Sequence, residues 1–313
     1  MNKLNRARSD QAKPRKRRGE SQWKLAFRRL RRHRPAVISA FVLASLVIVA
    51  LVAPWIEPYP PDAPNLEVMS GGPSAQHWLG TDSLGRDLLS RIIDASRISL
   101  SIGLLAVVVA VMVGSLIGGL SGFYGGWLDN ILMRLVDVFL AVPPFMLLIL
   151  ITVAYGGGTM WAIILAIGLL SWMPVARLVR GSFLSLKEAE FVEAARSAGA
   201  SSLRIILRHL FPNSLSPVIV AATLGVANAI LVESALSFLG FGVQPPTATW
   251  GNILKEAFED IHVSAWPTLF PGAMIFLTVI AINFLGDGLR DALDPRLGPS
   301  SAGPSGRSAS SEG

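Results

Sequence analysis

Long charge-free stretches alternate with polar segments along this chain of 313 residues. A membrane-spanning helix needs about 20 consecutive apolar residues, because the hydrocarbon core of a bilayer is about 30 Å thick. Five stretches are long enough for at least one such helix, and they cover residues 36–56, 98–128, 138–176, 209–232 and 263–286. The pattern predicts an integral membrane protein, in agreement with a mean hydropathy of +0.51.

The third stretch is long enough for two helices, and Tyr155-Gly156-Gly157-Gly158-Thr159 divides it. Consecutive glycines lose too much backbone entropy to continue a helix, so we expect a tight external turn there. The sequence therefore predicts an all-α membrane protein with six transmembrane helices. Their expected limits are 36–55, 99–123, 131–154, 160–178, 214–237 and 267–287.

The distribution of lysine and arginine predicts how these helices are oriented. With six spans, 24 of the 28 basic residues fall on one side of the membrane, and only Arg86, Arg91, Arg97 and Lys255 fall on the other. Basic residues are enriched in cytoplasmic segments of bacterial-type inner membrane proteins. Both termini and the segment 181–213 are therefore expected in the cytoplasm.

The segments between and around the spans differ in composition. Residues 1–34 form a basic cytoplasmic tail before a first helix at 35–56, a loop at 57–96 is extracytoplasmic, and residues 97–287 hold the other five helices. Residues 288–313 form a second cytoplasmic tail, rich in Ser, Gly and Ala beyond Pro299 and expected to be partly disordered. The basic tail could contact nucleic acid phosphates, but a polybasic segment beside a span favours membrane lipids as its partner.

Two features near the second span predict local packing. Apolar residues at 88, 89, 92 and 93 predict a helix over 87–94 that lies along the outer membrane interface. Within the span, Gly114, Gly118 and Gly122 recur every four residues, which favours close approach of another helix backbone over a ligand-binding role.

Ionisable residues near the spans need partners or water, because charges are costly in hydrocarbon. Arg134 and Asp137 are three residues apart and are expected to pair on one helix. Glu233 lies deeper, in the fifth span before Ser234 and Ser237, and is a candidate for the translocation path.

The residue types required for several enzyme classes are missing from the sequence. It contains no cysteine, no Gly-x4-Gly-Lys-Ser/Thr loop and no His-Glu-x-x-His pattern, and its four histidines are dispersed. We therefore expect no catalytic residues, no metal site and no cofactor in this chain.

The cytoplasmic segment 181–213 has the pattern of two short helices. The first, over 186–198, places Phe191, Ala194, Ala195 and Ala198 on one face, and Gly199 suits a helix stop with positive φ. Ser201 or Ser202 can cap the second helix. Its apolar stripe comprises Leu203, Ile206, Leu207 and Leu210, with Arg204 and Arg208 on the polar side and Pro212 ending the unit.

This segment resembles the Glu-Ala-Ala loop of binding-protein-dependent ABC importer permeases. The family pattern is Glu-Ala-Ala, three residues, Gly, nine residues, Ile, one residue and Leu-Pro. The chain matches it at Glu193, Ala194, Ala195, Gly199 and Pro212, and has His209 and Phe211 in place of Ile and Leu, which leaves the apolar face intact.

Further motifs resemble the dipeptide/oligopeptide/nickel group of this family, and within it the second permease. They are Trp78 to Asp87, Glu233 to Gly242, Pro245-Pro246 with Trp250-Gly251, and Asp294-Pro295-Arg296-Leu297. The resemblance implies the type I ABC importer permease fold over 97–287. It also implies a heterodimer with a homologous permease, two cytoplasmic ATP-binding subunits that hydrolyse ATP, and an extracytoplasmic solute-binding protein.

The resemblance implies transport of di- and oligopeptides by alternating access, with nickel chelates, glutathione or another small solute as alternatives. In this interpretation the ATPase-coupling loop comprises Glu193, Ala194, Ala195, Gly199, Arg204, Leu207, Arg208 and Pro212, with the arginines facing acidic groups of an ATPase. A stand-alone secondary transporter or channel, using Glu233 or Asp137 for coupling ions, is a rival hypothesis. A membrane anchor or scaffold is another.

Overall fold

The structure is a computed structural model that describes residues 22–154 and 158–293. The described residues form helices and no strands. The basic tail before residue 22, most of the Gly-rich turn and the Asp294 to Leu297 motif with the tail after it lie outside the described residues. The helices are α1 (Gln22–Leu30), α2 (Arg34–Ile56), η1 (Leu66–Val68), α3 (Leu88–Tyr124), α4 (Gly126–Ala141), α5 (Pro144–Ala154), α6 (Met160–Leu170), α7 (Trp172–Leu186), α8 (Glu190–Ser197), α9 (Ser202–Ile205), η2 (Ile206–Leu210), α10 (Phe211–Phe238), α11 (Trp250–Glu259) and α12 (Trp266–Leu293).

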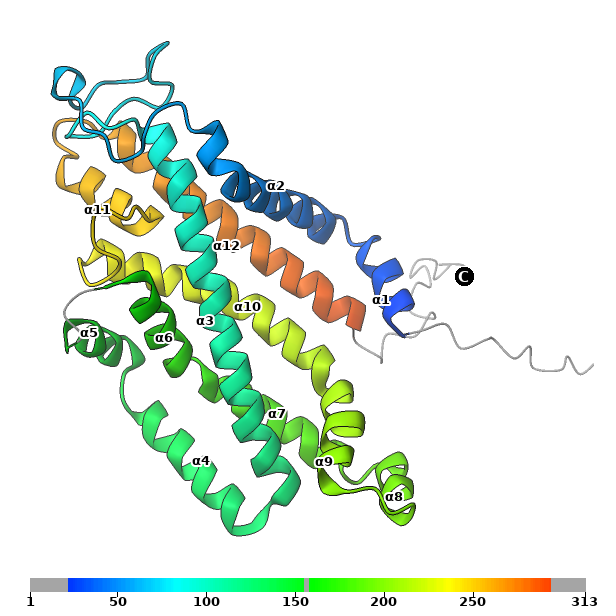
Figure 1. Cartoon of the computed structure of the whole chain (residues 1–313). Coiled ribbons are helices and arrows are strands. Elements are labelled where there is room, and N and C mark those ends of the chain that lie inside the picture. The colour runs from blue at the N-terminus through cyan, green and yellow to red at the C-terminus, as the bar shows by residue number, and fades with distance from the viewer. Residues whose placement is uncertain (1–21, 155–157, 294–313) are drawn as a thin grey trace, which may run out of the picture.

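Four long helices form the body of the molecule, and α2, α3, α10 and α12 run side by side in Figure 1. Four continuous helices are long and apolar enough to span a membrane: Arg34–Ile56, Leu88–Tyr124, Ser202–Phe238 and Trp266–Leu293. Two bent pairs, α4 with α5 and α6 with α7, bring the number of candidate spans to six. The six apolar segments of the sequence are thus all helical.

The third and fourth predicted spans, 131–154 and 160–178, are each formed by a bent pair of helices. α4 and α5 meet at 84°, and α6 and α7 meet at 40°. Val142 has extended backbone angles at the first bend, because Pro143 follows it and a residue before proline avoids helical angles. Pro144 is the first residue of α5. An N–H group at this position has no partner within the helix, so the missing N–H of proline costs no hydrogen bond.

The start of α3 corrects the expectation of a separate interfacial helix over 87–94. The Asp87 carboxylate caps the helix by accepting a hydrogen bond from the Ser90 N–H at 2.8 Å, and the helix then runs without a break to Tyr124. No proline or glycine interrupts 88–102, so the amphipathic turns continue into the span. At about 1.5 Å per residue, α3 is about 55 Å long and extends beyond the hydrocarbon core.

The small residues of α3 lie against α7, as the sequence predicts. A Cβ atom at Gly114 would lie 2.7 Å from the Trp172 carbonyl oxygen, and one at Gly118 would overlap the backbone of Ala176. α3 also packs against α2, α4, α6, α10 and α11. This helix is therefore the centre of the packing.

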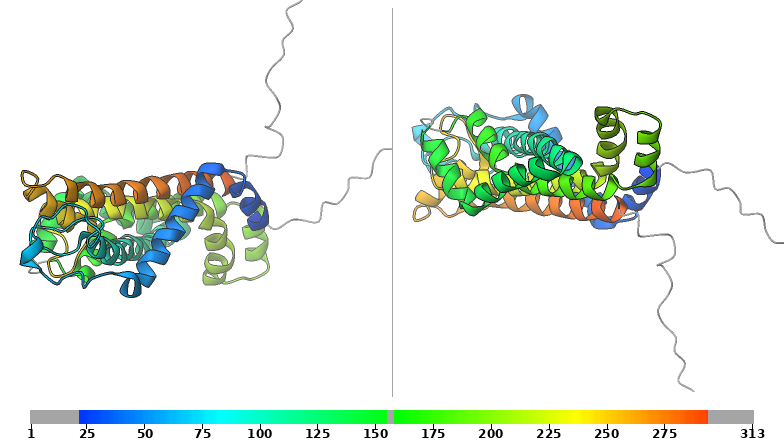
Figure 2. Two further views of the ribbon diagram at one scale, coloured as in Figure 1. Left: turned by 90° about the horizontal axis from the view of Figure 1, so that it is seen from above. Right: turned by 90° about the horizontal axis from the view of Figure 1, so that it is seen from below.

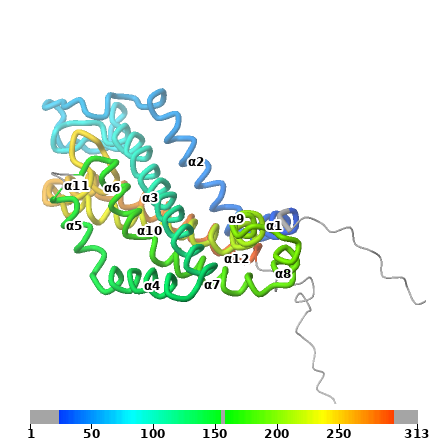
Figure 3. The backbone as a smooth tube through the Cα atoms, turned by 60° about the horizontal axis from the view of Figure 1, so that its bottom comes forward, coloured from blue at the N-terminus to red at the C-terminus, as the bar shows by residue number. Residues whose placement is uncertain are grey.

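The two ends of the molecule carry different elements. The loop before α3, together with α5, α6 and α11, lies at one end, and α1, α8, α9 and the last turns of α12 lie at the other (Figure 3). Viewed along the perpendicular direction, α8 and α9 project from the bundle (Figure 2). The segment with the coupling-loop motif is thus displaced from the membrane helices.

We predict that Gly118→Ala destabilises the fold. The added Cβ overlaps the backbone of Ala176, which cannot move without separating α3 from α7, so the free energy of unfolding should fall by about 1–3 kcal/mol. Thermal unfolding of the purified chain in detergent measures the change. Gly181→Ala is the control, because no atom lies within 4 Å of its added Cβ and alanine favours helix. Equal melting temperatures for the two variants would contradict the packing role of Gly118.

Candidate functional site

The segment between α7 and α10 begins with a short helix that ends at a glycine. α8 closes at Gly199, whose φ is +80°, which confirms the predicted positive angle. The Gly199 N–H donates to the Arg196 carbonyl oxygen and the Ala200 N–H donates to that of Ala195, each at 3.0 Å. These bonds satisfy the last carbonyls of α8 and fix the direction in which the chain turns toward α9.

The second helix begins at a serine cap and does not end at Pro212. Ser201 Oγ accepts a hydrogen bond from the Arg204 N–H at 3.4 Å. From Ser202 the helix is continuous to Phe238, so the expected break before the fifth span is wrong. The π-helical turn at Ile206–Leu210, where the Phe211 N–H donates to the Ile206 carbonyl oxygen, widens the helix just before Pro212 and accommodates its ring.

Three buried apolar side chains attach this unit to the membrane helices. Val192 of α8, Ile205 of α9 and Leu210 of η2 are at most 2% exposed. They pack in one cluster with residues of α7 and α10, namely Val175, Val179, Phe183 and Val218. A displacement of α8 or α9 would therefore be passed to both helices, because a close-packed cluster deforms little.

The apolar residues of the unit divide between a buried and an exposed side. In α8, Val192 is buried, whereas Phe191, Ala194 and Ala198 are exposed and Ala195 is half-buried. In the second stripe, Leu210 is buried and Ile206 is half-buried, whereas Leu203 and Leu207 are 65% and 60% exposed.

Apolar and charged side chains thus lie together on the outside of the unit. We call this the α8–α9 surface, and its members are Phe191, Glu193, Ala194, Leu203, Arg204, Leu207, Arg208 and Pro212, all exposed. Within residues 22–154 and 158–293, no ion pair involves Glu193, Arg204 or Arg208. Exposed leucines beside unpaired charges are typical of a surface that another protein covers.

A second group of charged residues lies at the opposite end of the molecule. Arg91 Nη1 donates to Asp82 Oδ2 at 2.5 Å and to Glu256 Oε2 at 2.6 Å. Arg86 bonds the same two carboxylates through Nε and Nη2, each at 2.7 Å. Asp82 and Arg86 belong to the loop, Arg91 to α3 and Glu256 to α11, so these four residues join three elements.

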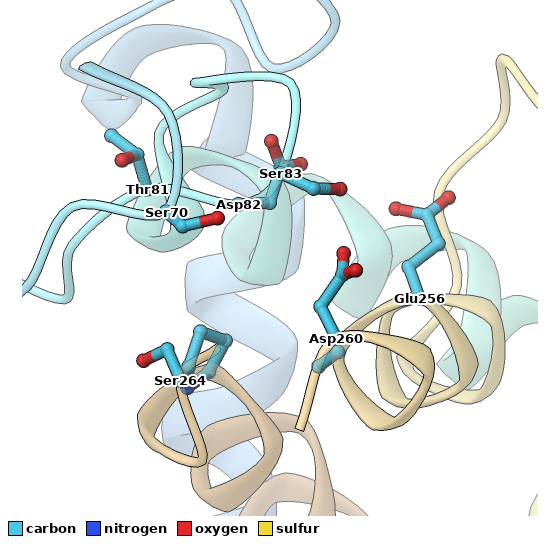
Figure 4. Close-up of a pocket in the computed structure, with 9 residues that line it drawn as sticks. Ser70, Thr81, Asp82, Ser83, Glu256, Asp260 and Ser264 are labelled. Atoms are coloured by element: carbon cyan, nitrogen blue, oxygen red, sulfur yellow. The ribbon is translucent and has the colours of Figure 1, made fainter. Parts of the chain in front are cut away.

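The loop that carries Asp82 is itself tightly folded. Its backbone turns back at Gly85, where φ is +73° and a Cβ would overlap the Asn65 backbone, and the Asp82 carboxylate accepts bonds from the Leu84 and Arg86 N–H groups at 2.9 Å. Figure 4 shows the small hollow beside it, between the loop, α11 and the start of α12. Its volume of about 20 Å³ suits roughly one water molecule, so it is not a solute site.

The ionisable residues singled out in the spans have other partners than expected. Asp137 does not pair with Arg134, but accepts a hydrogen bond from Arg177 Nη2 of α7 at 2.6 Å. The side chain of Arg180 makes two bonds to Asp129 at 2.6 and 2.7 Å. Both pairs tie α4 to α7, which local spacing could not indicate because the partners are about 40 to 50 residues apart in sequence.

Glu233 is fully buried between α10 and α11. Its Oε1 accepts a hydrogen bond from Ser237 Oγ at 2.7 Å, and Ser234 and Thr249 lie beside the same carboxyl group. Gly251 of α11 approaches so closely that a Cβ would lie 2.7 Å from Ser237 Cβ. Its Oε2 has no hydrogen-bond partner among the described residues, and a place on the translocation path stays a prediction.

Comparison with known proteins identifies the family. The family described as binding-protein-dependent transport system inner membrane component matches residues 110–299, which is more than half of the chain. The chain belongs to this ABC importer permease family. Residues 21–74 match the family described as the N-terminal TM domain of oligopeptide transport permease C. The motif resemblance to the dipeptide/oligopeptide/nickel group is thereby confirmed.

Individual relatives agree with this assignment. The permease is 45% identical over 278 residues to the glutathione transport system permease protein GsiD of Escherichia coli O6:K15:H31 and of Shigella boydii serotype 4, covering 88% of this chain and 91% of theirs. Among solved structures, the inward-facing MetNI methionine ABC transporter superposes with a TM-score of 0.53 at 19% identity, over 66% of this chain and 98% of that chain. That likeness shows the type I permease fold.

The family assignment settles the class of the protein and its setting. It is a multi-pass inner membrane transport permease, and its family is not one of enzymes. The expectations of no metal and no cofactor are not tested by the structure. The ion-pair network of Asp82, Arg86, Arg91 and Glu256 was missed from the sequence, although the closely spaced charges between Asp82 and Arg91 were a signal for it.

We predict that Glu256→Gln destabilises the permease. It leaves two buried guanidinium groups facing the single carboxylate of Asp82. Removing one partner of a buried pair costs about 3–5 kcal/mol, and Glu256 is 24% exposed, so we expect about 2–3 kcal/mol. Thermal unfolding in detergent reports the loss.

Glu259→Gln is the matched control on the same helix. Its carboxylate is 62% exposed and faces Lys255 at 3.5 Å, so its removal should cost less than about 1 kcal/mol. If Glu256→Gln and Glu259→Gln lower the melting temperature equally, the network has no structural role.

Proposed function

We propose that this permease pairs with a homologous permease to form the translocation path of an ATP-driven importer. Two ATP-binding subunits supply ATP hydrolysis, one of them binding the α8–α9 surface of this chain, and a solute-binding protein delivers the solute on the other side. The observation that carries the proposal is the exposed α8–α9 surface, which is anchored to α7 and continuous with α10. The membership of the family supports the same partners.

The orientation of the chain follows from the same arrangement. α1, α8, α9 and the end of α12 lie at one end of the molecule (Figure 3). Most of the basic residues in the described ranges belong to these elements or directly follow them in the sequence. The positive-inside rule favours this end for the cytoplasm, where ATP is available to the partners. The Asp82 to Glu256 network then lies on the extracytoplasmic side.

Alternating access is the transport mechanism that this geometry favours. Closure of the ATP-binding subunits displaces α8 and α9, and Val192, Ile205 and Leu210 transmit the displacement to α7 and α10. Because α9, η2 and α10 are one helix, a tilt of α9 reorients the fifth span as a rigid element. Glu233, on that same helix, would move with it.

The substrate that the comparisons favour is glutathione. The curated relatives that match 88% of the chain are named as glutathione permeases, which supports this alternative better than the di- and oligopeptides that we placed first. Glutathione is itself a short peptide, so the two expectations share their chemistry. The comparisons lend no comparable support to nickel chelates.

Uptake into proteoliposomes tests the substrate. The permease is reconstituted with its permease, ATPase and binding-protein partners, with ATP inside and radiolabelled glutathione or an α-linked tripeptide outside. We expect saturable glutathione uptake that stops when ATP is replaced by a non-hydrolysable analogue. Uptake of the tripeptide alone would identify a general peptide importer. Uptake that continues without the ATPases would favour the secondary transporter.

The turn at Gly199 gives a direct test of coupling. Valine at φ +80° costs about 1–2 kcal/mol and shifts α8 relative to α9, so Gly199→Val should reduce uptake at least about fivefold while the ATPase continues to turn over. Gly199→Asn is the control, because asparagine tolerates this backbone angle. Uptake and substrate-stimulated ATP hydrolysis are measured on the same preparation. Normal coupling in the valine variant would refute a role for this turn.

A further inference from the structure

A group of cations surrounds an exposed aromatic ring on α1, apart from the proposed transport machinery. Lys24, Phe27, Arg28, Arg31 and Arg32 line an open hollow of about 340 Å³. The Phe27 side chain is 62% exposed, and the Arg31 guanidinium lies 5.9 Å from its ring centre. We call these five residues the α1 basic site.

The helical spacing explains why these residues share a face. Lys24 and Arg28 are four residues apart, as are Phe27 and Arg31, and the Arg31 N–H continues the helix by donating to the Phe27 carbonyl oxygen at 3.1 Å. The opposite face is packed, since Ala26 is 8% exposed and Leu30 lies against Gly288 of α12. α1 is therefore an amphipathic helix with a fixed outward face.

The surroundings of the site indicate where its ligand comes from. Arg34 begins α2, the first membrane span, and the apolar residues Val37, Ile38 and Phe41 are 43%, 64% and 75% exposed. These three residues of α2 closely follow the last cation of the site, Arg32, in the sequence. The site thus lies where lipid headgroups meet the hydrocarbon, and an exposed Phe beside basic residues is typical of a helix that lies in this interface.

Nearby acidic side chains leave the site positively charged. On α12, which packs against α1, Asp291 faces His33 at 3.9 Å and Asp287 is exposed, while Arg290 adds a further cation. Within the described ranges, no ion pair is formed by Lys24, Arg31 or Arg32. A phosphodiester headgroup supplies the matching charge and several acceptor oxygens.

We propose that the α1 basic site binds the headgroup of an anionic phospholipid, with one acyl chain against Phe27 and the exposed residues of α2. The bound lipid fixes α1 against α12 through the Leu30 and Gly288 contact. This proposal does not depend on which solute the importer carries. It differs from diffuse attraction of the basic tail in having a defined set of residues.

Native mass spectrometry of the full-length chain tests the proposal. The detergent micelles contain equal amounts of phosphatidylglycerol and phosphatidylcholine, and the retained lipid is counted. We expect preferential retention of phosphatidylglycerol by the unaltered chain. The triple variant K24Q/R31Q/R32Q should reduce it by at least about tenfold, because three cations near the headgroup are lost.

Two matched variants make the test specific. K16Q/R17Q/R18Q removes the same charge from the preceding tail and should change retention by less than about twofold. K24R/R31K/R32K keeps the charge and should retain the lipid, which also guards against a folding defect in the glutamine variant. Melting temperatures in lipid-free detergent are compared for all of them.

Four results would overturn the proposal. Equal retention of both lipids by the unaltered chain would remove the headgroup preference, and equal loss in the tail variant would assign it to diffuse attraction. Displacement of the lipid by millimolar inorganic phosphate would indicate a free-phosphate site. Displacement by a short RNA would indicate a nucleic-acid site.

Discussion

The close approach of α3 to α7 is the contact on which the arrangement of the other helices depends. Gly114 and Gly118 bring the two backbones together at a distance that any side chain would prevent. In a bilayer, lipid chains are as apolar as leucine, so helices gain more from close packing than from hydrophobic burial. With α7 fixed in this way, the bent pair of α6 and α7 can wrap α3 while α10 packs beside both.

This contact also connects the two charged ends of the molecule. At one end, Arg91 of α3 holds the loop and α11 through Asp82 and Glu256. At the other, α7 carries Val175, Val179 and Phe183, which pack against the unit of α8 and α9. A push on that unit therefore reaches α3 through α7, the helix packed most closely against it, and α3 continues without a break to the loop that carries Asp82.

The sequence predicts those features that depend on short-range chemistry. The six apolar segments, the glycine stripe and the left-handed turn at Gly199 follow from length, spacing and backbone freedom. Features that depend on residues distant in the chain could not be predicted from the sequence. Asp137 pairs with Arg177 across two helices, and the helix from Ser202 continues past Pro212 to Phe238 with a π turn at Ile206–Leu210. Neither fact is encoded in local periodicity.

The placement of charge separates internal structure from binding surfaces. Asp82, Arg86, Arg91 and Glu256 pair with one another, as do Asp129 and Arg180, so these groups add rigidity and leave little charge for a partner. Arg204 and Arg208 lie outward beside exposed leucines, which suits a protein surface with both apolar and acidic groups. Lys24 and Arg31 lie outward beside one aromatic ring next to a membrane span, which suits a lipid. The same residue type thus serves three purposes, and in each case the neighbouring atoms determine which.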